Sequence, residues 1–127
     1  MEKNKLEPKI LESSFYEKSW GSETWIINTP NYCLKYLDFK MNKKFSMHFH
    51  SVKTETWTIQ SGKYILRWID TSNANINEMI LEKDMIIDIH PLLPHQIECL
   101  EEGRIIEVST QHFEDDSYRV QKGDSQK

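Results

Sequence analysis

The stretch MHFHSVKTE at residues 47–55, followed by Gly62, carries the strongest pattern in the chain. Side chains two positions apart on a β-strand point to the same face, so His48 and His50 are expected to project together. A short turn through residues 51–54 would bring back a neighbouring strand that begins at Glu55, with its carboxylate beside the two imidazoles. This spacing indicates a metal site far more strongly than the histidine pair alone.

A fourth ligand is available at His95, which follows the turn PLLP at residues 91–94 and opens another predicted strand. Burying Glu55 as an isolated anion would be costly, and a metal ion removes this cost because its charge favours an ionised carboxylate and neutral imidazoles. Three nitrogens and one oxygen suit one divalent ion of zinc, manganese, iron, cobalt or nickel. We therefore predict a metal site on His48, His50, Glu55 and His95, with positions left for water or substrate.

The rest of the sequence indicates short strands separated by turns. Several segments alternate apolar and polar residues with period two and are rich in Ile, Trp, Tyr, Phe and Thr. The predicted strands lie at 24–28, 33–40, 45–50, 55–60, 63–69, 78–82, 85–89, 95–100 and 104–110. Helical periodicity is weak, and a turn near residues 10–16 is the one helical candidate. So many strands in a small domain predict an all-β sandwich or barrel.

Length and composition set the organisation of the chain. Its 127 residues, 38% hydrophobic and 28% charged, suit a single soluble domain. The ends are polar, so we predict a flexible segment at 1–13, a folded domain at 14–120 and a flexible tail at 121–127. The aromatic residues on the strands are expected to form mostly core, with one or two lining a pocket: Trp25, Tyr36, Trp57, Tyr64 and Trp68.

Charge and targeting signals exclude several partners. The net charge is −4 and no long basic run is present, which weighs against a nucleic-acid partner. No apolar stretch is long enough to cross a bilayer, and the first residues lack a secretory signal. We expect a cytoplasmic protein with no membrane partner, in which Cys33 and Cys99 are two separate thiols.

The residues of the metal pattern resemble the two motifs of the cupin superfamily. His48, His50, Glu55 and Gly62 match the spacing of the first motif without deviation, and the segment KDMIIDIHPLLPH at 83–95 resembles the second. The second motif departs from the pattern at Lys83, which replaces a glycine, and at His90, which stands in the usual proline position. This resemblance implies a single-domain cupin, a double-stranded β-helix or jelly-roll barrel.

Two further signatures resemble the cupin domain of type II phosphomannose isomerases. They are the WGS run at 20–22 and the closing run EVST at 107–110, followed by EDD at 114–116 and Arg119. The similarity spans about residues 16–120. The turn after His50 is two residues longer than in those domains, their frequently fused nucleotidyltransferase domain is not present here, and the run Asn-Lys-Lys at 42–44 stands where they carry an arginine. A lysine replacing that arginine would not be equivalent at a bidentate site.

The resemblance implies a metal-dependent isomerase that acts on a sugar phosphate or related activated sugar, of the aldose–ketose type, in carbohydrate or surface-polysaccharide metabolism. Such a reaction needs a metal to polarise the substrate oxygens and a base to move a proton between adjacent carbons. We predict Glu55 as ligand and catalytic base, with His90, His112 and Glu107 as alternative bases. His90 and His112 are left out of the metal set.

Other functions remain open at this point. The nearest candidate cations for a substrate phosphate are Lys44, Lys53 and Arg67. An iron-dependent cupin dioxygenase would use the same ligand set, and a cupin that binds a sugar without catalysis would share the fold. No cofactor besides the metal is expected, and the resemblance implies a homodimer.

Overall fold

The protein is built almost entirely of β-strands. A computed structural model describes residues 6–126, in which no α-helix forms and no helix is long and apolar enough to cross a membrane. The regular elements are β1 (Ser14–Lys18), β2 (Gly21–Asn28), β3 (Cys33–Phe39), β4 (Met47–Phe49), β5 (Glu55–Ile59), β6 (Lys63–Ile69), β7 (Ile76–Leu81), β8 (Ile86–Ile89), β9 (His95–Glu101), β10 (Gly103–Ser109), β11 (Tyr118–Gln121) and the 3₁₀ turn η1 (Asp124–Gln126).

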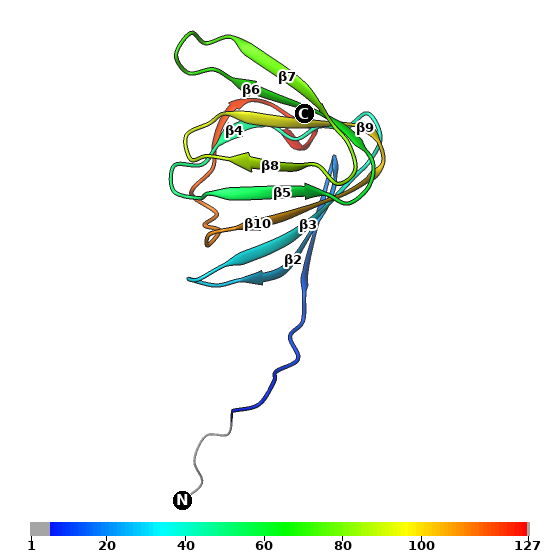
Figure 1. The fold of residues 1–127 in the computed structure, drawn as a ribbon, viewed down its shortest axis with the longest axis vertical. Coiled ribbons are helices and arrows are strands. Elements are labelled where there is room, and N and C mark those ends of the chain that lie inside the picture. Colours follow the sequence, from blue (N-terminus) through cyan, green and yellow to red (C-terminus); the bar gives the residue numbers. More distant parts are fainter. Residues whose placement is uncertain (1–5, 127) are drawn as a thin grey trace, which may run out of the picture.

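The strands form two antiparallel sheets that face each other. The first sheet has six strands in the order β1-β2-β3-β10-β5-β8, and the second has five in the order β11-β4-β9-β6-β7. The chain crosses repeatedly from one sheet to the other, so strands distant in sequence, such as β3 and β10, become neighbours (Figure 1). This is the jelly-roll architecture that the sequence predicted.

Alternation along the strands places the core between the sheets. In β5, Glu55, Trp57 and Ile59 are buried while the two threonines between them are partly exposed. Trp57 and Ile59 join a cluster that includes Tyr64, Ile97 and Ile105, all almost fully buried. Burying each such side chain contributes about 1.5–3 kcal/mol. The same alternation carries Glu55 to the interior, which positions it for the site.

Gly62 makes the hairpin between β5 and β6 possible. Its φ of +88° lies in a region that L-residues rarely adopt, and a Cβ there would lie 2.6 Å from the carbonyl oxygen of Glu101. The backbone conformation of the hairpin therefore requires glycine at this position of the sequence motif, independently of metal binding.

The structure differs from the sequence prediction near the amino terminus. Residues 14–18 form strand β1 rather than part of a helical turn, because they pair with β2 through a short hairpin at Ser19 and Trp20. Tyr16 packs its ring 4.6 Å from that of Trp25, which holds the hairpin together. Residues 6–13 carry no regular structure and extend away from the sheets (Figure 1).

The carboxyl-terminal segment, predicted as a flexible tail from residue 121, begins inside β11, which pairs with β4. Beyond it, Asp124 Oδ2 accepts a hydrogen bond of 2.7 Å from the backbone N–H of Lys44. Gly123 is buried, and a Cβ there would lie 2.3 Å from the backbone of Phe45. These contacts attach the segment to the strand that carries the first histidines.

Candidate metal centre

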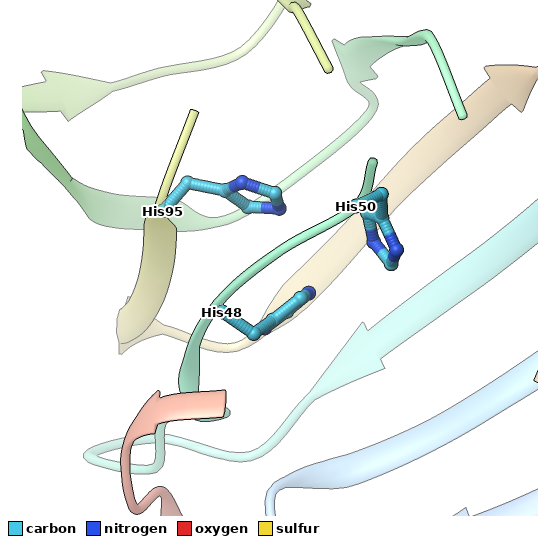
Figure 2. A group of neighbouring side chains, drawn as sticks. All are labelled: His48, His50 and His95. Atoms are coloured by element: carbon cyan, nitrogen blue, oxygen red, sulfur yellow. The ribbon is translucent and has the colours of Figure 1, made fainter. Parts of the chain in front are cut away.

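Three histidines converge between the two sheets, as Figure 2 shows. His48 lies in β4, His50 directly follows that strand, and His95 is the first residue of β9. His48 and His95 are register partners across the β4–β9 pair. Their ligand nitrogens and that of His50 all lie within 4.8 Å of one another, close enough to share one ion.

Each imidazole is oriented by a backbone carbonyl. His48 Nδ1 lies 2.8 Å from the carbonyl oxygen of Ser46, and His95 Nδ1 lies 2.8 Å from that of Leu93. His50 Nδ1 makes the same kind of contact to the carbonyl of Asp116. Since a carbonyl only accepts, each Nδ1 carries the proton and each Nε2 keeps its lone pair. A hydrogen bond from the ring nitrogen that does not bind metal is what typically orients metal-binding histidines in proteins.

Burial keeps the three imidazoles neutral. Desolvation lowers the pKa of His48 to about 3, and the neighbouring His95 adds to the shift. Burial likewise lowers the pKa of His50 to about 4 and that of His95 to about 4. At neutral pH all three lone pairs are therefore available to a cation.

Glu55 lies beside the histidine cluster. Its Oε1 accepts a hydrogen bond of 2.6 Å from Trp57 Nε1, and its Oε2 lies 3.5 Å from His50 Nε2. Among the described residues, Glu55 Oε2 and His95 Nε2 are the two buried side-chain atoms that have no hydrogen-bond partner. Such atoms are costly unless something binds them, and a divalent cation between them fits this donor set.

A row of buried charges continues from the cluster across the first sheet. Lys53 Nζ lies 2.9 Å from Glu107 Oε2, 3.5 Å from Glu55 Oε2 and 3.2 Å from His112 Nδ1. Lys35 Nζ lies 4.2 Å from the centre of the Trp25 ring. Both lysines and Glu107 are less than 5% exposed, which is rare for ionised side chains and points to a role beyond folding.

The buried pair of carboxylates differs in its electrostatics. Burial would raise the pKa of Glu107, but the ammonium groups of Lys53 and Lys35 outweigh it and hold that pKa low. The pKa of Glu55 is raised by burial and by the negative charge of Glu107. Burial would lower the pKa of Lys53, yet Glu107 and Glu55 raise it, so the ammonium stays charged. Glu107 and Lys53 therefore form a permanent ion pair beside Glu55.

Asp116 holds the turn that links His50 to Glu55. Its Oδ1 accepts hydrogen bonds of 2.8 Å from both the backbone N–H and the hydroxyl of Ser51, and its Oδ2 accepts one of 3.0 Å from the backbone N–H of Lys53. The backbone N–H of Val52 lies 3.2 Å from each oxygen. One buried carboxylate thus fixes three consecutive amides and, through its carbonyl, the ring of His50.

The histidine cluster and the buried charges line a cavity of about 210 Å³ between the sheets. Its wall carries the histidine cluster and the buried charges together with aromatic and cationic side chains, among them Trp25, His112 and Arg119. The volume accommodates a small polar molecule rather than a polymer. Both charged groups and aromatic rings lie beside the cluster, among the latter Phe45 and Trp57, so the cavity suits a ligand with polar oxygens and an apolar carbon surface.

The other predicted residues divide into those that line the cavity and those that do not. His90 is exposed and lies outside the cavity wall, whereas His112 lines it. Of the predicted cations, Lys53 points into the cavity, while Arg67 pairs with Glu98 at 2.7 Å and does not line it. Lys44 likewise does not line it.

Sequence reasoning missed Lys35, Asp116 and the interior position of Lys53. The burial of Lys35 could have been predicted, because it lies on the same face of its strand as the apolar residues Cys33 and Leu37, which are buried. The role of Asp116 could not have been predicted from the sequence, where this residue stands out only as part of the EDD run. Cys33 and Cys99 are buried free thiols, as predicted.

Comparison with solved structures identifies the fold. One match is the capsular polysaccharide assembling protein CapF from Staphylococcus aureus, with a TM-score of 0.74, 23% identity, and coverage of 87% of this chain and 34% of that chain. CapF with the inhibitor 3-isopropenyl-tropolone gives a TM-score of 0.77 at 24% identity, again covering 87% and 34%. Oxalate decarboxylase from Bacillus subtilis gives 0.76 at 14% identity, covering 86% and 30%.

These matches show that the chain has the cupin jelly-roll fold, as the sequence motifs predicted. The chain spans about a third of the length of each matched protein. No protein-family model matches the chain, and no curated protein matches it. The narrower resemblance to phosphomannose isomerases stays a prediction.

Proposed function

We propose that the protein is a metal-dependent cupin that isomerises a sugar phosphate or a related activated sugar, of the aldose–ketose type. The observation that carries the proposal is the pair of unpartnered buried atoms, Glu55 Oε2 and His95 Nε2, beside a polar cavity. The ligand set of the proposal is His48, His50, Glu55 and His95. When bound, a divalent ion supplies a Lewis acid that polarises the oxygens of a carbonyl or hydroxyl group.

Several metals fit three nitrogens and one oxygen, namely zinc, manganese, iron, cobalt and nickel. Manganese gains support from the fold comparison, since a matched oxalate decarboxylase structure is described with Mn(II) centres. The tautomers fixed by the carbonyls of Ser46, Leu93 and Asp116 present Nε2 for any of these ions.

The charges of the cavity support a polar, oxygen-rich substrate. Among the described residues, the wall carries four cations, Lys18, Lys35, Lys53 and Arg119, and four carboxylates, Glu23, Glu55, Glu107 and Glu114, and both buried lysines are paired with carboxylates. The CapF match, a capsular polysaccharide assembling protein, supports a substrate related to sugars. An iron-dependent dioxygenase would favour an apolar cavity, and the buried ion pair of Lys53 with Glu107 in the wall supports the isomerase over that alternative.

Glu55 is our candidate for the catalytic base. Its Oε2 has no hydrogen-bond partner and lies 3.5 Å from both His50 Nε2 and Lys53 Nζ, and it would act as a base while only loosely bound to the metal. In the proposed reaction, Oε2 accepts the proton of the carbon that bears the hydroxyl and returns it to the neighbouring carbonyl carbon, while the hydroxyl proton passes to the former carbonyl oxygen, so that the carbonyl and the hydroxyl exchange places. The permanent ion pair of Lys53 with Glu107 keeps Glu107 from competing for that proton.

The proposal extends to assembly and location. A homodimer is supported by apolar side chains on the outer strands, since Ile80 of β7 and Ile86 of β8 are 43% and 74% exposed. Two buried thiols without a disulfide support the cytoplasm as the compartment.

The test measures metal content by elemental analysis after purification and after reconstitution with each candidate metal. About one equivalent per chain is expected in the wild type, with its loss in His95→Ala and its retention in His90→Ala, the matched exposed control. Interconversion of mannose 6-phosphate and fructose 6-phosphate is then assayed with each metal, beside Glu55→Gln. Full metal loading without turnover would leave a cupin that binds sugars without catalysis, and oxygen consumption with the iron form would favour the dioxygenase.

A further inference from the structure

His112 is held at the wall of the cavity by contacts with Asn28 and Trp25. Its backbone N–H donates to Asn28 Oδ1 at 2.8 Å, and Asn28 Nδ2 donates back to its carbonyl at 3.0 Å. Its ring packs at 5.1 Å from the Trp25 ring with an interplanar angle of 72°. The paired amide contacts fix the main chain and the aromatic contact fixes the ring plane, so the imidazole is held before any ligand binds.

Lys53 determines which nitrogen of this imidazole carries the proton. Lys53 Nζ lies 3.2 Å from His112 Nδ1. An ammonium group has donors only, so Nδ1 accepts and the proton of the neutral ring lies on Nε2. Burial together with Lys35 and Lys53 lowers the pKa of His112 to about 3, which keeps the ring neutral.

Among residues 6–126, the proton on Nε2 has no strong partner. The nearest acidic oxygen, Glu114 Oε1, lies 4.0 Å away on a side chain that is 81% exposed. That distance is too long for a hydrogen bond. The His112 ring centre lies 6.4 Å from that of His50, so the free N–H borders the same cavity as the histidine cluster.

We propose that His112 is a ligand-binding residue that donates its Nε2–H to an oxygen acceptor of a metal-bound ligand. This inference rests on the proposed metal site and narrows its substrate class to small molecules that bind the metal through oxygen and present to the wall an unprotonated oxygen with a lone pair left to accept a hydrogen bond. Carboxylates, hydroxamates and the carbonyl of an α-hydroxycarbonyl compound have that chemistry. A ligand that offers only a donor there would leave Nε2–H unpaired.

The tautomer is tested first, on the wild-type protein without ligand. Nitrogen NMR of the histidine side chains is expected to show His112 with a protonated Nε2 and an unprotonated Nδ1. A proton on Nδ1, or exchange between the two tautomers, overturns the proposal. This measurement does not depend on metal loading, so its failure is separate from failure of the proposed function.

Ligand binding is tested next with acetohydroxamate on the cobalt(II)-loaded protein, followed by visible absorption. His112→Phe keeps a ring against Trp25 without the donor and is expected to bind this anion roughly 10- to 100-fold more weakly. His112→Gln keeps an amide N–H near the position of Nε2 and is expected to recover most of the affinity. His90→Phe is the exposed control, and unchanged cobalt affinity in all variants excludes loss of the metal.

Equal binding by His112→Phe and wild type overturns the proposal, as does a cobalt-loaded wild type that does not bind acetohydroxamate. Failure of the wild type to take up cobalt overturns the metal site itself and the ligand contact with it. Weaker binding in His112→Phe alone, with recovery in His112→Gln, supports the donor role.

Discussion

Replacing Asp116 by asparagine should disturb both the turn at residues 51–53 and the metal centre. The change turns one of the two accepting oxygens into an NH₂ group, which cannot accept from the amides that face it. If Oδ2 is replaced, the 3.0 Å bond from the Lys53 amide and one of the two 3.2 Å contacts of the Val52 amide are lost. The exposed Asp115 provides a matched control, Asp115→Asn.

The magnitude follows from the number of bonds. Each hydrogen bond to a charged acceptor contributes about 1.5–3 kcal/mol, so losing one full and one shared bond should lower the free energy of unfolding by about 3 kcal/mol. For a chain of this size that is a fall in melting temperature of roughly 10 °C. Because the carbonyl of Asp116 also orients His50, metal affinity should fall by roughly 10- to 100-fold.

Urea unfolding of the metal-free protein and a competition titration with a chromophoric zinc chelator measure the two effects separately. If Asp116→Asn unfolds at the same urea concentration as Asp115→Asn, the account of the turn is wrong. If stability falls while zinc affinity is unchanged, the turn does not position His50, and the coupling inferred here between Asp116 and the site is refuted.

Three further outcomes follow from the buried groups and from the hairpin. Lys53→Met should lower the free energy of unfolding by about 3–5 kcal/mol, because Glu107 would stay buried without its 2.9 Å partner. Equal urea midpoints for Lys53→Met and the partly exposed control Lys63→Met would contradict this. Burial lowers the pKa values of His48, His50 and His95 to about 3, 4 and 4 from 6.5, so the unfolded state binds more protons between those values and the metal-free protein should lose stability as pH falls from 6.5 towards 4. Urea midpoints across that range test it, and a slope as steep in His95→Gln as in wild type would argue against it. Gly62→Ala should lower the free energy of unfolding by about 1–3 kcal/mol because the φ of Gly62 is +88°. A melting temperature equal to that of Lys63→Ala would contradict this and show that the hairpin accommodates a side chain.

The parts of the site that sequence could predict are those governed by local geometry. His48 and His50 share a face because of the strand period, and Glu55 follows at the start of β5. His95 could be placed because a proline-bounded turn precedes it. The structure brings the three histidines within 4.8 Å and Glu55 within 3.5 Å of His50, as the spacing implied.

The parts that sequence could not predict depend on the path of turns and tails. Lys53 lies inside the turn after His50, where strand parity gives no direction, and its burial depends on Asp116 holding that turn from a segment distant in the chain. Strand β11 is short and its four residues are all exposed, so its existence rests on pairing with β4 rather than on a hydrophobic pattern. The early helical prediction was wrong because the pairing of β1 with β2 overrides a weak local preference.

The pairing of His48 with His95 joins strands that are far apart in sequence and close together only once β4 and β9 have met. The loops that bring them together must close before any ion can bridge the site, so we expect this contact to form late in folding. Metal would then contribute little to the transition state and much to the native state. We expect saturating zinc to leave the refolding rate nearly unchanged and to slow unfolding. The bound ion would then give the closed barrel kinetic stability.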